Sequence, residues 1–344
     1  MDTQNYKLAR TAKLGWSFFY NLIETHFLNQ YPETLKDWEC RNNNPTSIIL
    51  NGEITAKDFI NLAAEFDYSK YTNISIEELE VLDYEYDNGY TCSLEEYLSF
   101  RVCEDAVRLF ELLKIYLNTQ TIKSFVVLDG CVFTPDKKTL VHIPEEKSVI
   151  VPTFIEHIGI AACCGYEDMS EIIYNDRLKS IGKWAFVGAG ISRLDLPDTL
   201  VSLGEDCFLM ADLEKVRLSN SLEAIPDGSF NLCNIEEITI PSSVRIIGNA
   251  SLRGLLFVDE IDIPEGVERI GYDALEGMNR VSLPSTLTEI APDFYYEECI
   301  GDPDFPPYIT VHPDNKTFIS QKGSLYFRDS GKLALKSEYH GKQY

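Results

Sequence analysis

The sequence of 344 residues is poor in the side chains that carry out most protein chemistry. It has 5 histidines, 4 methionines and 3 tryptophans, and its 9 cysteines form no Cys-x-x-Cys pair. No glycine-rich phosphate loop and no set of ligands at zinc spacing occurs, so the sequence predicts neither a cofactor nor a metal site. An odd number of unpatterned cysteines argues against a disulfide framework and favours buried, reduced thiols.

Long hydrophobic runs are lacking as well. None approaches the roughly 20 apolar residues that a membrane-spanning helix needs. The apolar stretch 14–23 follows three basic residues, as in a signal peptide, but it contains Asn21 and has no small-residue cleavage site, which favours an ordinary amphipathic helix. The printed chain therefore favours the cytoplasm. A cell-surface or secreted location is the alternative if a leader was removed.

Positive charge is scarce. The 30 Lys and Arg residues face 55 Asp and Glu residues, which gives a formal charge of −25. Such a surface repels phosphate backbones and anionic lipid head groups, and this argues against nucleic acid and membrane insertion as modes of binding. The partner class that the charge favours is another protein, and a basic protein in particular.

Internal repetition is what the sequence has in abundance. An isoleucine or leucine, usually followed by glycine, recurs every 20–23 residues. These anchor positions are Ile158, Ile181, Leu203, Ile225, Ile247, Ile270 and Ile290. Half a repeat later comes an alternating stretch such as LDLP, VRLS or ITIP, which predicts a short half-buried strand. About six apolar side chains per repeat cannot offset the entropy of ordering about 22 residues, so the repeats must share one core as a solenoid.

The repeat pattern Ile-Gly-x-x-Ala-Phe, followed by Leu-x-x-Ile-x-Ile-Pro, resembles the BspA-like class of leucine-rich repeat. Segments that begin at Ser124 and Asn315 resemble the hairpins that flank such arrays. The resemblance implies a repeat solenoid over residues 121–344, a right-handed leucine-rich-repeat array with short parallel strands and end-cap hairpins at about 124–145 and 309–337. It also implies a bacterial, adhesin-like or other binding protein.

Residues 1–120 follow a helical hydrophobic period and predict a small α-rich N-terminal domain, whose family we do not recognise. Three capping patterns predict helix starts: Thr55 with Asp58, Ser75 with Glu78, and Ser93 with Glu96. The last of these opens a helix expected over 94–117. A further helix is expected over 6–29 and a short strand over 48–50, and the acidic stretch 77–87 is interpreted as the solvated face of a helix.

The candidate binding site consists of the outward positions of the predicted strands. On each strand the middle residue points inward, and its two neighbours point outward. The outward residues predicted to bind a partner are Arg193, Asp195, Lys215, Arg217, Glu237, Thr239, Glu260, Asp262 and Arg280. Basic side chains near the third repeat and acidic ones over the next two predict a dipolar strip, a surface of the kind that solenoids use for binding.

The sequence therefore predicts a non-enzymatic protein that binds another protein. It leaves open a surface adhesin and an acidic inhibitor or immunity-type protein that blocks a basic partner. The alternative from another class is an enzyme with its site in the N-terminal domain and repeats that select the substrate. Cys163 or Cys164 with His157 is the nearest approach to a catalytic pair, but the repeat register favours a buried structural thiol there.

Overall fold

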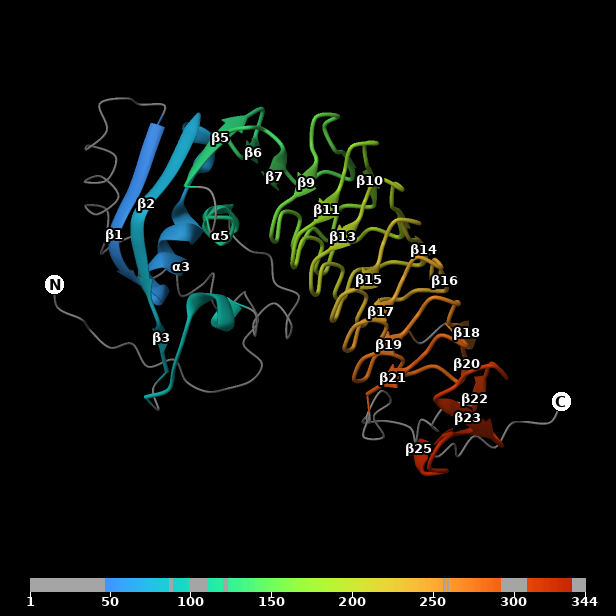
Figure 1. Cartoon of the computed structure of the whole chain (residues 1–344). Helices are drawn as coiled ribbons and strands as arrows, with labels where there is room; N and C mark the ends of the chain where they lie inside the picture. Colours follow the sequence, from blue (N-terminus) through green and yellow to red (C-terminus); the bar gives the residue numbers. More distant parts are fainter. Residues whose placement is uncertain are drawn as a thin grey trace. The chain divides into compact units, whose positions relative to one another are not determined.

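The computed structural model describes residues 47–86, 89–98, 111–119, 123–255, 258, 260–291 and 308–335. The chain divides into two compact units, Met1–Lys137 and Lys138–Tyr344 (Figure 1). The division comes after a hairpin near residue 130, whereas the sequence predicts a boundary after residue 120. The helix expected over 6–29 lies outside the described residues.

The first unit is built on a small mixed sheet. Strand β1 (Ser47–Thr55) is parallel to β2 (Asn73–Leu82), which is antiparallel to β5 (Ser124–Leu128). A hairpin then joins β5 to β6 (Cys131–Phe133) through Asp129 and Gly130, both at positive φ, which is typical of a two-residue Asp-Gly turn. The other elements are the helices α3 (Ala56–Glu65), η1 (Tyr68–Lys70) and α5 (Glu111–Leu117), with the strand pair β3 (Tyr84–Glu85) and β4 (Thr91–Cys92).

Two of the three predicted helix starts are confirmed. The Asp58 amide donates to Thr55 Oγ1 at 3.1 Å, and α3 begins directly after Thr55. At the later start, the Glu96 amide donates to Ser93 Oγ at 3.1 Å while the Ser93 amide donates to Glu96 Oε2 at 2.8 Å, which is a complete capping box. Residues 94–98 and 111–117 of the expected helix are helical, and those between lie outside the description. The strand expected over 48–50 is also present, within β1.

The helix start at Ser75 with Glu78 is wrong, because these residues lie in strand β2. Ile74 and Ile76 are both buried, at 0% and 2% exposure, and this period of two fits a strand with one face in the core. The acidic stretch 77–87, interpreted from sequence as a helix face, accordingly enters this strand. The described part of the first unit is thus mixed α/β rather than α-rich.

The second unit is a parallel solenoid in which each full turn contributes two short strands (Figure 1). One series contains the anchor positions and consists of β7 (Thr139–His142), β9 (His157–Ile158), β11 (Ser180–Ile181), β13 (Ser202–Leu203), β15 (Ala224–Ile225), β17 (Ile246–Ile247), β19 (Arg269–Ile270) and β21 (Glu289–Ile290). The other consists of β8 (Ser148–Ile150), β10 (Glu171–Ile173), β12 (Arg193–Asp195), β14 (Lys215–Arg217), β16 (Glu237–Thr239), β18 (Glu260–Asp262), β20 (Arg280–Leu283) and β22 (Tyr308–Val311). An antiparallel sheet of β23 (Phe318–Gln321), β24 (Ser324–Phe327) and β25 (Leu333–Leu335) follows.

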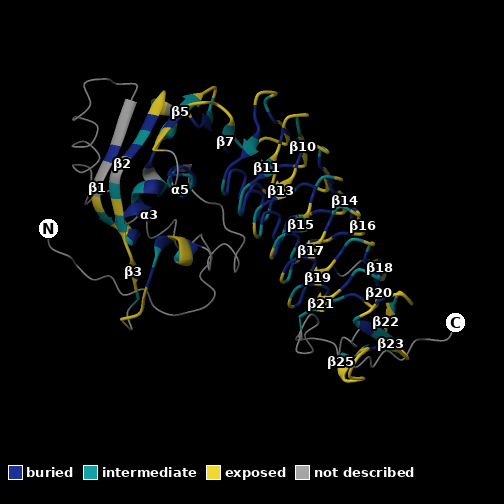
Figure 2. Cartoon of the chain, viewed as in Figure 1, coloured by how far each residue is buried: buried dark blue, intermediate teal, exposed yellow. Residues whose placement is uncertain are grey.

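The predicted anchors form the core of this array. Six of the seven are at most 5% exposed, and the last, Ile290, is half-buried. Phe186, Phe208 and Phe230 occupy one position in three successive turns, and their rings stack at 5.2 and 5.4 Å between centroids. Figure 2 shows buried and exposed residues alternating along the turns. The apolar side chains of each turn are therefore covered by the turns before and after it.

The glycines after the anchors lie where adjacent turns approach each other closely. A Cβ on Gly182 would come within 2.7 Å of the Gly159 carbonyl carbon, and one on Gly204 within 2.3 Å of the Lys183 nitrogen. Both contacts are with backbone of the preceding turn. These positions lack a side chain because adjacent turns approach too closely to admit one.

Neighbouring isoleucines in β17 test the register of the array. Ile247 is 0% exposed and Ile246 is 39% exposed. Ile247→Asp should place an unpaired carboxylate in the shared core and lower the free energy of unfolding by about 3 kcal/mol or more. Ile246→Asp should cost about 1 kcal/mol or less. Urea denaturation of both variants checks this, and equal losses would show that the register is wrong.

The six cysteines in the described residues are reduced thiols. Five are buried, and Cys131 in the β6 hairpin strand is half-buried. Burial raises the pKa of the Cys233 thiol to about 12 and raises that of Cys207 as well. Since the thiolate is the reactive form, the core thiols of the array should be inert in the folded state.

Alkylation with iodoacetamide tests this arrangement. In native protein, Cys131 should be modified before Cys163, Cys164, Cys207 and Cys233, which should react only after denaturation because burial blocks access and suppresses ionisation. Peptide mass spectrometry measures the order of labelling. Equal native labelling of Cys131 and Cys207 would contradict the packing described above.

Candidate protein-binding surface

Strands β12, β14 and β16 carry six of the nine predicted binding residues on one surface. Their register places Arg193, Lys215 and Glu237 in one row across the sheet, and Asp195, Arg217 and Thr239 in another. All six are exposed, whereas the middle residues point inward. We call the exposed surface of these three strands the charged face.

The charged face is hollowed. A cavity of about 540 Å³ opens over the three strands and is lined by both polar side chains and the edges of core residues. The lining residues are Arg193, Leu194, Lys215, Val216, Arg217, Leu218, Asn220, Glu237, Thr239 and Pro241. A surface with both charge and depth can position a partner's side chain as well as attract it.

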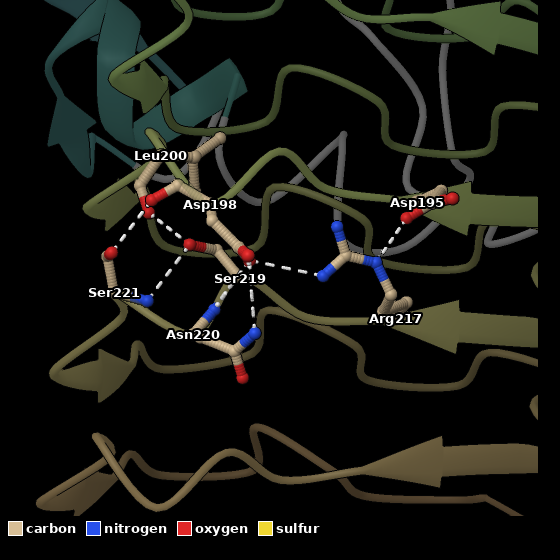
Figure 3. Close-up of polar contacts among 7 residues, drawn as sticks. All are labelled: Asp195, Asp198, Leu200, Arg217, Ser219, Asn220 and Ser221. Carbon is tan, nitrogen blue, oxygen red and sulfur yellow. Dashed lines mark hydrogen bonds and ion pairs between the residues drawn. The ribbon is translucent and has the colours of Figure 1, made fainter. Parts of the chain in front are cut away.

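Arg217 is not free to pair with a partner, because two carboxylates of this chain already hold it (Figure 3). Its Nε donates to Asp195 Oδ1 at 2.5 Å on the neighbouring strand, and its Nη1 donates to Asp198 Oδ1 at 3.1 Å in the loop beyond. These bonds to Asp195 and Asp198 raise the pKa of the Arg217 guanidinium. Arg217 therefore orders the charged face rather than offering an open charge.

Asp198 ties this ion cluster to the next turn. Its carboxylate accepts from the Asn220 backbone amide at 3.1 Å and from Asn220 Nδ2 at 3.2 Å. These hydrogen bonds, with that of Arg217, lower the pKa of Asp198. The sequence reasoning missed both residues, although each follows its strand by the same offset, and that periodic offset is the signal that could have identified them.

Arg193 and Lys215 differ from Arg217. Both are exposed, and in the described part of the chain neither lies within ion-pair distance of a carboxylate. Within the described residues, the charged face thus presents two positive charges outside any ion pair, in a protein whose formal charge is −25.

The remaining predicted residues lie on a separate sheet. Glu260 and Asp262 belong to β18 and Arg280 to β20, which pair with each other and then with β22. All three side chains are exposed as predicted. The paired strands in the described residues form two separate sheets, β12-β14-β16 and β18-β20-β22, instead of one continuous strip. The residues of the predicted dipolar strip thus lie on two sheets, β12-β14-β16 and β18-β20-β22.

A second hollow of about 450 Å³ lies near Glu156, Lys179 and Asp198. Glu156 accepts from Lys179 Nζ at 2.5 Å and from Lys138 Nζ at 3.1 Å. Hydrogen bonds from Lys179 and Lys138 hold the pKa of Glu156 down to about 2. The cluster joins Glu156 to a lysine of the preceding turn and a lysine of the following turn, so we interpret it as a structural link between turns.

Catalytic and metal-binding groups are not apparent within the described ranges. No three His, Cys, Asp or Glu side chains there could together hold a metal ion. Nδ1 of His157 lies 2.7 Å from Ser180 Oγ, and Cys163 and Cys164 are at most 1% exposed, which agrees with structural thiols. Among the helices that the structure describes, none combines the length and apolar character needed to cross a bilayer.

Sequence comparison identifies the repeats. The model of the BspA type leucine rich repeat region matches residues 142–255 and 247–320, in six copies. Together these ranges include more than half of the 344 residues. The chain matches none of the curated proteins with which it was compared.

Several solved structures of bacterial leucine-rich repeat proteins are similar to this chain. A leucine rich cell surface protein from Faecalibacterium prausnitzii is 14% identical over 48% of this chain and 72% of its own, with a TM-score of 0.30. A leucine-rich repeat protein from Bacteroides ovatus is 17% identical over 48% and 65%, with a TM-score of 0.30. The pneumococcal vaccine antigen PcpA is 15% identical over 60% and 43%, with a TM-score of 0.27. The chain spans less than two thirds of the last two.

The Glu156 cluster makes stability depend on pH. The pKa of Glu156 is about 2 in the folded state, below the ordinary value of 4.5. The contribution of Glu156 to the free energy of unfolding is therefore complete above about pH 4.5 and disappears as the pH falls toward 2. Glu156→Gln should therefore destabilise the protein at pH 6 and approach the parent's stability near pH 2.

Urea denaturation across this pH range measures the difference between the two proteins. Glu205→Gln, which removes the exposed ion pair with Lys183, controls for the loss of a single carboxylate. If the difference in free energy of unfolding between the parent and Glu156→Gln stays constant down to pH 2, the stabilising role of ionised Glu156 is contradicted.

Proposed function

The chain belongs to the BspA-type leucine-rich repeat family, and we propose that it is a non-enzymatic protein that binds another protein through the charged face. The observation that carries this proposal is the hollowed surface on β12, β14 and β16, where outward charges stand on strands fixed by a common core. Solenoids offer extended surfaces of this kind to their partners.

The charged face is preorganised for binding. The middle residues Leu194 and Val216 are 1% and 6% exposed, so core packing fixes the backbone that carries the outward side chains. Asp195 and Asp198 immobilise Arg217 before any partner arrives. Binding therefore requires little further ordering of the surface, and this reduces the entropic cost of association.

Two cellular settings are consistent with this proposal. In one, the protein is an adhesin at the cell surface. In the other, it is an acidic inhibitor or immunity-type protein inside the cell, where its charge of −25 steers a basic partner toward it. Fractionation of the native cell separates the two, because the adhesin would be recovered with the envelope and the inhibitor with the cytoplasm.

A charge swap tests the binding surface. Lys215 and Glu237 face each other across β14 and β16, so Lys215→Glu with Glu237→Lys keeps the net charge and the opposite-sign neighbours but reverses their order. The native partner, first isolated by affinity capture and identified by mass spectrometry, should bind this double variant about tenfold more weakly or worse, with little change in Tm.

The array provides a matched control. Arg269 and Glu289 form an exposed ion pair at 2.9 Å on the anchor strands β19 and β21. Arg269→Glu with Glu289→Arg is an equivalent swap away from the charged face and should leave the affinity unchanged. The binding site would lie outside the charged face if only this control lost affinity, or if both variants bound as tightly as the parent.

A further inference from the structure

The first two strands of the outward series carry an exposed apolar pair. Ile150 in β8 and Ile173 in β10 are paired in register and are 66% and 46% exposed. They occupy the third position of their strands, which is filled by Asp195 in β12, Arg217 in β14 and Thr239 in β16. Two large aliphatic side chains at a position that is otherwise charged or polar form a local apolar patch.

The isoleucine pair lies one turn before the charged face, on the separate two-stranded sheet β8-β10. The turn of β10 is bonded to the turn of β12 on both sides of the strands, by Gly190 N to the Tyr166 carbonyl at 3.0 Å and by Thr199 Oγ1 to the Leu178 carbonyl at 2.9 Å. Strands in adjacent turns lie about 4.8 Å apart. Lys215, two turns beyond Ile173, is therefore roughly 10 Å along the array from the apolar patch.

Two cations of the charged face, Arg193 and Lys215, favour an anionic group. Arg193 and Lys215 have no ion-pair partner in the described residues, whereas Arg217 is held by two carboxylates. Covering Arg193 and Lys215 without an opposite charge would cost desolvation energy that nothing repays. Glu237 is paired in register with Lys215, and Glu171 is the first residue of β10, one turn before Arg193. Both carboxylates would repel a carboxylate placed out of register.

We propose that the isoleucine pair and the charged face together bind one segment of a partner protein, in which a large apolar side chain and a carboxylate lie about 10 Å apart. The apolar side chain covers Ile150 and Ile173, and the carboxylate pairs with Arg193 and Lys215. This rests on the proposed function and specifies the chemistry of the partner's contact. It is compatible with a partner that is basic overall, because the field of distant charges is screened within about 8 Å at physiological salt.

Selection from a displayed library of random dodecapeptides tests the proposal with the full chain as the target. The selected peptides should combine an aliphatic or aromatic residue with Asp or Glu. Their affinity should fall about tenfold or more in Ile150→Ser with Ile173→Ser, and again in Arg193→Glu with Lys215→Glu, since each double variant removes one half of the site.

Two substitutions at exposed positions elsewhere serve as controls. Leu232→Ser removes a 48% exposed leucine, and Lys322→Glu reverses an exposed lysine at the β23–β24 turn. Both should leave peptide binding unchanged. Peptides rich in Lys or Arg, peptides indifferent to the two double variants, or no selected peptide at all would overturn the proposed chemistry, while the charge swap with the native partner judges the proposed function separately.

A second copy of the chain is the other occupant that the apolar pair could accept. Sedimentation equilibrium of the parent protein distinguishes a self-associating chain from one that binds a different protein. The proposal predicts no self-association that depends on the isoleucine pair. A dimer that dissociates in Ile150→Ser with Ile173→Ser would overturn the proposal, because the patch would then be covered by the protein itself.

Discussion

Sharing of one hydrophobic core by successive turns is the constraint on which the array depends. Its strands are two to four residues long, too short to be stable alone, and many of the backbone amides between them bond to the neighbouring turn. Ala161 N donates to the Lys183 carbonyl at 2.9 Å and Cys163 N to that of Ala185 at 2.8 Å. Stability in such a structure is a sum over neighbours, so a fault in one turn weakens the next.

Because only the inward positions fill the shared core, the outward positions can vary in sequence. Inward positions must fill the shared core, whereas outward positions need only remain compatible with the strand. Here they carry the Arg217 ion cluster, whose partner Asp195 lies on the preceding turn. The charged face therefore consists of side chains that the packing of the core does not require. A specific partner can therefore be accommodated without any change in fold.

Much of the array could be predicted from sequence because the repeat samples each position several times. The anchors at Ile181 and Ile225 are buried, and Lys215 and Glu237 point outward, as the spacing indicates. One backbone feature was not predicted: Trp184 and Asp206 are in left-handed conformation at the offset where Gly228 stands in the next turn. The residue type alone does not reveal this conformation. Repetition also fails to reveal contacts between loops, such as Asp198 with Asn220.

The first unit contains no repeat, so each of its elements has to be predicted from a single stretch of sequence. In β2 a capping pattern and an acidic run suggested a helix, whereas Ile74 and Ile76 pack as a strand against β1. Local propensity was overridden there by pairing with a strand distant in sequence. Contacts between distant residues also limit the prediction of the candidate site. The sequence indicates which residues face outward, but not that Arg217 is already paired.

Hydroxyl-radical footprinting of the complex with the native partner tests the central claim most directly. The account predicts reduced side-chain oxidation at Ile150, Ile173 and Lys215 when the partner is bound, with exposed Leu232 and Tyr272 oxidised as in the free protein. Protection of Leu232 and Tyr272 with none at Ile173 and Lys215 would contradict the assignment of the binding surface.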